Sequence, residues 1–154
     1  RSARILVMGP PGSGRSSIAR GLSKRFGFVN INTAHLLADQ ASKRTEIGRM
    51  CIPIIAEGEL VPDDIICSLV TQRLKQPDCN IHGYILDGFP KTGPQISLLY
   101  DLKIRPTVIV VLECPDEIAI ERLSHKKIDP VSGQIYDLNE LKQDLPQEIL
   151  DRLQ

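Results

Sequence analysis

The chain has 154 residues, of which 42% are hydrophobic, and this is enough apolar material for one globular domain with its own core. Its 19 basic and 19 acidic side chains balance, so we expect neither nucleic acid nor an anionic membrane as a partner. No apolar run approaches the roughly 20 residues of a membrane span, and the four cysteines lack metal-site spacing, so we expect buried thiols in a reducing compartment.

A short strand and an amphipathic helix are predicted at the start of the chain. Arg4–Met8 is an apolar run typical of a strand buried on both faces. Arg15–Phe26 carries apolar residues at helical spacing and ends at Gly27. Val29–Ile31 is a second strand candidate, and Thr33 is placed to cap the helix after it.

The middle of the chain alternates helical and strand patterns. The helical pattern that runs to Glu57 is polar and breaks near Thr45. Pro62 suits the start of the next helix. Tyr84–Leu86 is a third strand candidate, and Thr107–Leu112 is a fourth, the most β-branched run in the chain.

The last third predicts a helix, a polar stretch and a short final helix. These are Pro115–His125, the polar residues 126–144 with turn signals, and Gln147–Leu153. Strands that alternate with helices predict an α/β fold with a parallel sheet flanked by helices. Ligands of such sheets bind beyond the carboxyl ends of the strands.

The glycine-rich stretch Gly9–Ser16 fits the pattern G-x-x-x-x-G-[KR]-[ST] of phosphate-binding loops. It lies between a predicted strand and a predicted helix, where backbone N–H groups and the helix N-terminus attract an anion. Ser16 or Ser17 is placed to offer a hydroxyl towards Mg²⁺ or phosphate. Arg15 stands where the pattern has lysine, and an ordinary glycine-rich turn is the alternative reading.

Four further motifs together resemble the adenylate kinase family, in chain order from Arg4 to about Arg152. They are Gly58-Glu59-Leu60-Val61-Pro62-Asp63, Leu86-Asp87-Gly88-Phe89-Pro90-Lys91-Thr92 followed by Gln95, Glu121-Arg122-Leu123, and Asp129-Pro130-x-Ser132-Gly133-x-x-Tyr136. The resemblance implies a P-loop NTPase-type fold in which residues 1–154 form one adenylate-kinase-like domain. It implies a helical segment for the nucleoside monophosphate at about 32–62 and a lid at about 126–144. The family's last core strand and helix would follow Arg152, so we expect the domain to be truncated at its C-terminal end.

The resemblance also implies a reaction, namely reversible Mg²⁺-dependent phosphoryl transfer from ATP to AMP that gives two ADP. By this resemblance, the catalytic residues are Arg15, Asp87, Lys91, Arg122 and Arg152. The residues implied to bind ATP are Gly12, Ser13, Gly14, Arg15, Ser16, Ser17, Arg122, Lys126, Ile135 and Tyr136. Those implied to bind AMP are Thr33, Glu59, Leu60, Val61, Gly88, Phe89, Pro90, Lys91 and Gln95, the last of which reads the base. Those implied to hold Mg²⁺, mostly through water, are Ser16, Ser17 and Asp87.

The chain departs from the family pattern at four charged positions. Arg15 replaces a lysine, Ala38 replaces an arginine that contacts the acceptor phosphate, and Lys91 and Lys126 replace arginines. Arginine and lysine are not interchangeable at phosphate sites, because only arginine forks onto two oxygens. The alternative is therefore a weakened or inactive domain that binds nucleotides or serves assembly within a larger protein. We expect a cytoplasmic location. The alternative is the cilium or axoneme, because the Asp129-Pro130 lid motif resembles such domains in ciliary proteins.

Some of these residues also have plainer readings. Asp87 suits the cap of a turn, and Arg122 and Lys126 suit solvent-facing positions. Tyr136 suits the core of a hairpin in the lid. Phe89 is expected to pack beneath its loop rather than stack on a base.

Overall fold

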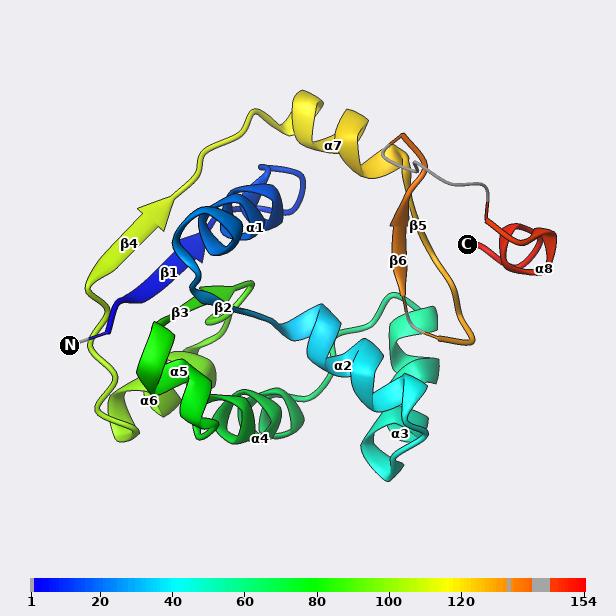
Figure 1. Ribbon diagram of the computed structural model, residues 1–154. Coiled ribbons are helices and arrows are strands. Elements are labelled where there is room, and N and C mark those ends of the chain that lie inside the picture. The colour runs from blue at the N-terminus through cyan, green and yellow to red at the C-terminus, as the bar shows by residue number, and fades with distance from the viewer. Residues whose placement is uncertain (1, 133, 140–144) are drawn as a thin grey trace.

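Four parallel strands form the central sheet of the computed structural model, which describes residues 2–132, 134–139 and 145–154. The strands are β1 (Arg4–Met8), β2 (Val29–Asn32), β3 (Tyr84–Asp87) and β4 (Val108–Val111), in the spatial order β2-β3-β1-β4 (Figure 1). All three pairings are parallel, which confirms the predicted α/β fold. The two central strands are the most buried, as expected for a sheet covered on both faces.

Helices cover both faces of the sheet at β1, β2 and β3, whereas the edge strand β4 is largely exposed (Figure 1). Helix α1 (Arg15–Phe26) packs on one face, where Ala19 meets Ile5, Val7 and Ile85. Helices α4 (Asp63–Leu74), α5 (Pro77–His82) and α6 (Gly93–Asp101) lie on the other.

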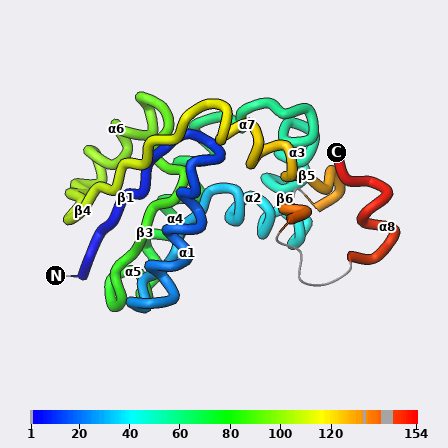
Figure 2. Tube along the Cα trace, turned by 90° about the horizontal axis from the view of Figure 1, so that it is seen from above, coloured from blue at the N-terminus to red at the C-terminus, as the bar shows by residue number. Residues whose placement is uncertain are grey.

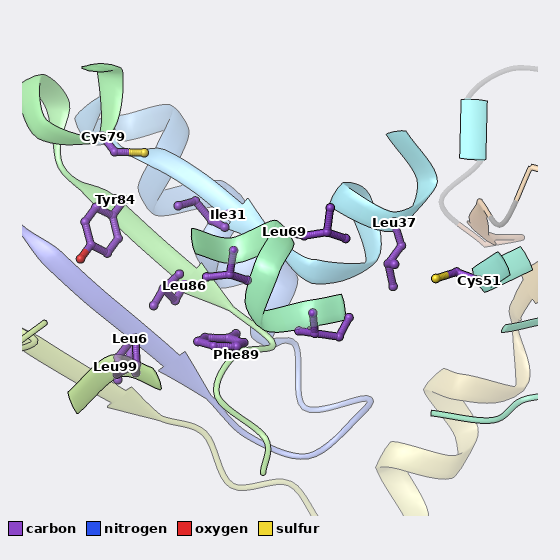
Figure 3. Packing of buried hydrophobic residues seen from close by; sticks show 12 residues of the cluster. Leu6, Ile31, Leu37, Cys51, Leu69, Cys79, Tyr84, Leu86, Phe89 and Leu99 are labelled. Atoms are coloured by element: carbon purple, nitrogen blue, oxygen red, sulfur yellow. The ribbon is translucent and has the colours of Figure 1, made fainter. Parts of the chain in front are cut away.

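The larger core cluster lies on the α4 and α6 side. Alternate residues of the strands point there, because successive side chains of a strand face opposite ways. Phe89 is 1% exposed and lies close to Leu86 and Leu69 (Figure 3). This confirms that Phe89 packs beneath its loop, where its burial stabilises the fold by about 1.5–3 kcal/mol.

The register of the sheet brings three strand ends level. Asp87 is the partner of Val7 in β1 and of Asn32 in β2. The loops that leave these strands therefore start side by side at the carboxyl edge, where ligands of parallel sheets bind.

A pair of helices forms an arm beside this edge. Helix α2 (Thr33–Ser42) ends before Thr45, which caps α3 (Glu46–Ala56) by accepting a hydrogen bond from Gly48 N. The expected break near Thr45 is confirmed. The expectation that Thr33 caps α2 is wrong, because Asn32 is the cap and Thr33 is the first residue of that helix.

The C-terminal part is a helix, a hairpin and a final helical turn. Helix α7 (Asp116–Ser124) leads into β5 (Lys126–Ile128), which pairs with β6 (Ile135–Asp137), and α8 (Gln147–Leu150) follows. Figure 2 shows the hairpin and α8 at the opposite end of the molecule from the N-terminus. The expected lid at 126–144 includes this hairpin, but its residues 133 and 140–144 lie outside the described part. Within the described ranges, no helix has the length and apolar character needed to cross a bilayer.

Candidate nucleotide-binding site

The phosphate-loop motif forms a backbone cradle between β1 and α1. Gly12 and Gly14 have φ values of +81° and +87°, which favour glycine, and a Cβ at Gly12 would lie 2.7 Å from the carbonyl oxygen of Ala119. Helix α1 has no side-chain cap and no acidic residue in its first turn. Its first N–H groups are therefore left for a ligand, and the helix dipole favours an anion there.

The serines of this loop differ in their surroundings. The Ser13 hydroxyl is buried without a hydrogen-bond partner in the described structure, and such groups are rare. The Ser16 hydroxyl lies 3.5 Å from Asn32 Nδ2, and Ser17 is exposed at the start of α1. The loop thus has spare hydrogen-bonding capacity.

Arg15 turns inward to the end of β3. Its Nε donates to Asp87 Oδ1 at 2.8 Å, and its Nη1 donates to the carbonyl oxygen of Gly9 at 2.9 Å. The side chain of Arg15 is 16% exposed and that of Asp87 is 0% exposed. Arg15 therefore joins the loop's first residue to the buried carboxylate.

Asn32 holds the other side of this carboxylate, and the sequence argument missed it. Its Nδ2 donates to Asp87 Oδ2, while its Oδ1 accepts a hydrogen bond from His35 N as the cap of α2. The cap fixes the orientation of the amide, because the oxygen must face the helix. An asparagine between a strand and a helix is a recognisable cap signal, but its contact with Asp87 depends on sheet order.

Lys91 lies close to the same charges. Partial burial lowers the pKa of its amine, the positive charge of Arg15 lowers that pKa further, and Asp87 opposes both effects. Gly88, with φ of +77°, passes under the arginine: a Cβ there would lie 3.2 Å from Arg15 Nη2. The turn after β3 therefore brings one acid and two cations together.

These surroundings do not fit a hydrated Mg²⁺ at Asp87. Mg²⁺ usually binds through one or two carboxylates and keeps several waters. Each oxygen of Asp87 already accepts a hydrogen bond. No group of three or more His, Cys, Asp or Glu residues suited to a metal lies elsewhere in the described ranges.

A pocket of about 270 Å³ opens between the arm and the turn after β3. Its lining consists of Thr33, Ala34, Leu37, Ile55, Glu59, Leu60, Val61, Ile66, Lys91 and Ile135. Five of these were expected to contact AMP. Ile135 was expected on the ATP side, but the structure brings it here because the β5–β6 hairpin approaches the end of α3.

Gln95, expected to read the base, is 5% exposed and held at both ends. Its Nε2 donates to Asp63 Oδ1 at 2.7 Å, and its Oε1 accepts from Lys91 N at 2.7 Å. The orientation of the amide is fixed because its nitrogen must face the Asp63 carboxylate and its oxygen must face the Lys91 N–H group. Asp63 is thus a second residue that the sequence argument missed.

The residues expected on the ATP side are not all gathered at the loop. Arg122 Nη1 donates to the carbonyl oxygen of Gly12 at 3.1 Å, so this arginine reaches the loop from α7. Lys126 is exposed in β5. The Tyr136 hydroxyl donates to Gln134 within the hairpin.

Arg152 is engaged by a carboxylate of the hairpin. Its Nε and Nη2 donate to the two oxygens of Asp129 at 2.7 and 2.8 Å, and Asp129 is 1% exposed. Burial opposes the shift, but the bonds from Arg152 and the Ser132 hydroxyl keep the pKa of Asp129 below its usual value. These bonds hold Arg152, which follows α8, against Asp129 at the end of β5.

Comparisons with known proteins agree with this geometry. The family model described as adenylate kinase matches residues 7–154. Adenylate kinases of Hamiltonella defensa, Kosmotoga olearia and Buchnera aphidicola are 37%, 35% and 35% identical to this chain over 88%, 90% and 96% of its length. The chain spans 62%, 66% and 71% of those relatives, and 47% of a chloroplastic relative from Oryza sativa. With a family match over almost its whole length, the chain belongs to the adenylate kinase family.

Proposed function

We propose that this chain is an ATP-dependent nucleoside monophosphate kinase that transfers a phosphoryl group reversibly from ATP to AMP. The observation that carries the proposal is the meeting of two sites at one sheet edge. The phosphate loop and the 270 Å³ pocket approach each other across the turn from Gly88 to Lys91. Lys91 lines the pocket and also lies beside Arg15 of the loop.

On the donor side, the protein offers positioning and positive charge. The N–H groups at the start of α1 are uncapped, and Arg122 reaches the loop at Gly12. Phosphoryl transfer depends mainly on such positioning and on cations around the phosphate oxygens.

On the acceptor side, the pocket offers mostly apolar walls and one cation. Leu37, Ile55 and Ile66 suit a purine ring, and the Lys91 amine suits the phosphate. Gln95 is not among the residues that line this pocket, but it binds Lys91 N, and its amide keeps one donor and one acceptor beyond those used on the protein. That pair matches the N6–H donor and N1 acceptor of adenine.

The proposed transfer is a single in-line displacement. A phosphate oxygen of AMP bonds to the γ-phosphorus of ATP, and the bond from that phosphorus to the β–γ bridging oxygen breaks. Lys91 and Arg122 would balance charge on the oxygens as they shift. No step is assigned to Asp87, whose oxygens are both engaged.

A coupled assay for ADP formation from ATP and AMP tests this proposal. Turnover should depend on both nucleotides, and its absence would contradict kinase activity. A matched pair of variants links turnover to the loop. Gly12→Ala should abolish ATP binding, since its Cβ would meet the Ala119 backbone. Gly21→Ala adds a Cβ in α1, the helix that follows this loop, with no atom within 4 Å, and should bind ATP normally.

A second candidate function is nucleotide binding with little turnover, as one domain of a larger cytoplasmic or ciliary assembly. It is favoured by the engagement of Arg15 with Asp87 and of Arg152 with Asp129. Separate calorimetric titrations with ATP and with AMP discriminate the two. Binding of ATP without AMP would favour this second function, and binding of both would favour the kinase.

A further inference from the structure

We propose that Arg15 takes the place of a divalent cation beside Asp87, so that this site binds the metal-free nucleoside triphosphate. The inference deepens the proposed function and rests on it, because it concerns the form in which the donor nucleotide binds. It starts from the disagreement between the surroundings of Asp87 and the needs of a hydrated Mg²⁺.

The carboxylate of Asp87 is buried, and both of its oxygens accept hydrogen bonds from side chains. Arg15 donates to Oδ1 and Asn32 donates to Oδ2. Neither donor is easily released. Asn32 would have to rotate and give up the cap of α2, which is worth about 1 kcal/mol.

The guanidinium is held at a second point as well. Nη1 donates to the carbonyl oxygen of Gly9, and Nη2 lies over Gly88 in space that a side chain there would need. Arginine makes these two bonds from separate nitrogens of one rigid planar group, whereas a lysine would have to make both from a single nitrogen.

A divalent cation at this position would be repelled by two neighbouring cations. Both Arg15 and Lys91 lie beside Asp87, and the carboxylate is already paired. The charge that a metal would supply is already present in the chain. The triphosphate can still bind to the N–H groups of α1 and to Arg122.

The test is calorimetric titration of the whole chain with ATP, once in excess EDTA and once in excess Mg²⁺. The wild-type dissociation constants should agree within about twofold in the two buffers. Arg15→Lys should free Asp87, so that Mg²⁺ tightens its ATP binding by about tenfold. Arg20→Lys makes the same exchange at an exposed position of α1 and should match the wild type.

Two results would overturn the inference alone: wild-type ATP binding that is about tenfold tighter with Mg²⁺, or an Arg15→Lys variant that binds ATP equally in both buffers. Absence of wild-type ATP binding in both buffers would instead overturn the proposed function, and this inference with it. Electron paramagnetic resonance of Mn²⁺ tests the wild type without any variant. Its spectrum with ATP should not change when the protein is added, and broadening would contradict the proposal.

Discussion

The proposed donor and acceptor sides of the site differ in how many of their charged groups are already paired. At the phosphate loop, Arg15 is already paired with the buried Asp87. The hydrogen bonds of Arg15 and Asn32 connect the ends of β1, β2 and β3. The acceptor pocket is mostly apolar, with Lys91 and Glu59 as its charged lining. The charged groups of the proposed donor side are therefore already paired within the protein. The proposed acceptor pocket has free space but only one positively charged side chain in its described lining.

This difference indicates that opposite changes on the two sides should raise the rate of the proposed reaction. The donor side should gain from a smaller, more mobile cation, and the acceptor side from an additional one. Four predictions follow from that contrast, in order of expected effect.

Arg15→Lys should raise kcat/KM for ADP formation by about tenfold to a hundredfold, because the ammonium can leave Asp87 and approach the transferred phosphoryl group. The coupled assay with saturating AMP and Mg²⁺ measures this change. Arg20→Lys on the same helix is the control and should leave the rate unchanged. An unchanged rate for Arg15→Lys would show that the closed network does not limit the reaction.

Ala38→Arg should lower the KM for AMP by about tenfold, with a smaller change in kcat, because a bidentate arginine strengthens phosphate binding. Ala38 lies one helical turn beyond Ala34, which lines the pocket. His35→Arg places the same charge on the same helix but in a separate pocket, which Asp39 and Gln40 also line, and serves as the control. Equal effects of both variants would indicate general attraction of an anion rather than a contact in the pocket.

Asp63→Ala should reduce the preference for AMP over IMP by about fivefold, because the Gln95 amide is no longer held in one orientation. Hypoxanthine presents the reverse donor and acceptor order to adenine, so a rotated amide accepts it. Asp64→Ala removes the neighbouring exposed acid and should keep the preference. An unchanged ratio in Asp63→Ala would contradict the role of the lock in base selection.

Asp129→Asn should have the smallest effect, a pH-dependent loss of thermal stability. The folded-state pKa of Asp129 lies below its unfolded value of about 3.9. Its stabilisation is therefore present above that pH and is lost as the pH falls through the folded value. The wild type should melt at a higher temperature than Asp129→Asn at pH 7, and the two should converge below about pH 4. Asp101→Asn, at an exposed position, should show no such convergence.

The sequence predicted the architecture well, for physical reasons. Strands buried on both faces are continuous apolar runs, and β1 and α1 have the predicted bounds. Helices α5 and α6 were missed. The first has six residues, and the second begins at Gly93-Pro94, where glycine and proline suggest a turn.

The site was predicted less completely than the fold. Motif spacing places Arg15, Asp87 and Lys91 at one sheet edge, and the structure brings them together. Which partner Arg15 takes could not be read from the motif, because it depends on the register of β3 beside β1 and on the direction of a long side chain. Asn32 and Asp63 were missed for the same reason: their partners are 55 and 32 residues away.

The side chain of Asn32 connects the arm to the phosphate loop, because it bonds both the start of α2 and Asp87. The same amide begins α2, whose first turn lines the acceptor pocket, and holds the carboxylate that pairs with the phosphate loop. Any ligand that shifts the start of α2 must also change the bonding of Asp87. We therefore expect a ligand in the pocket beside α2 to change the order of the phosphate loop, and by reciprocity a ligand at the loop to change the affinity of that pocket.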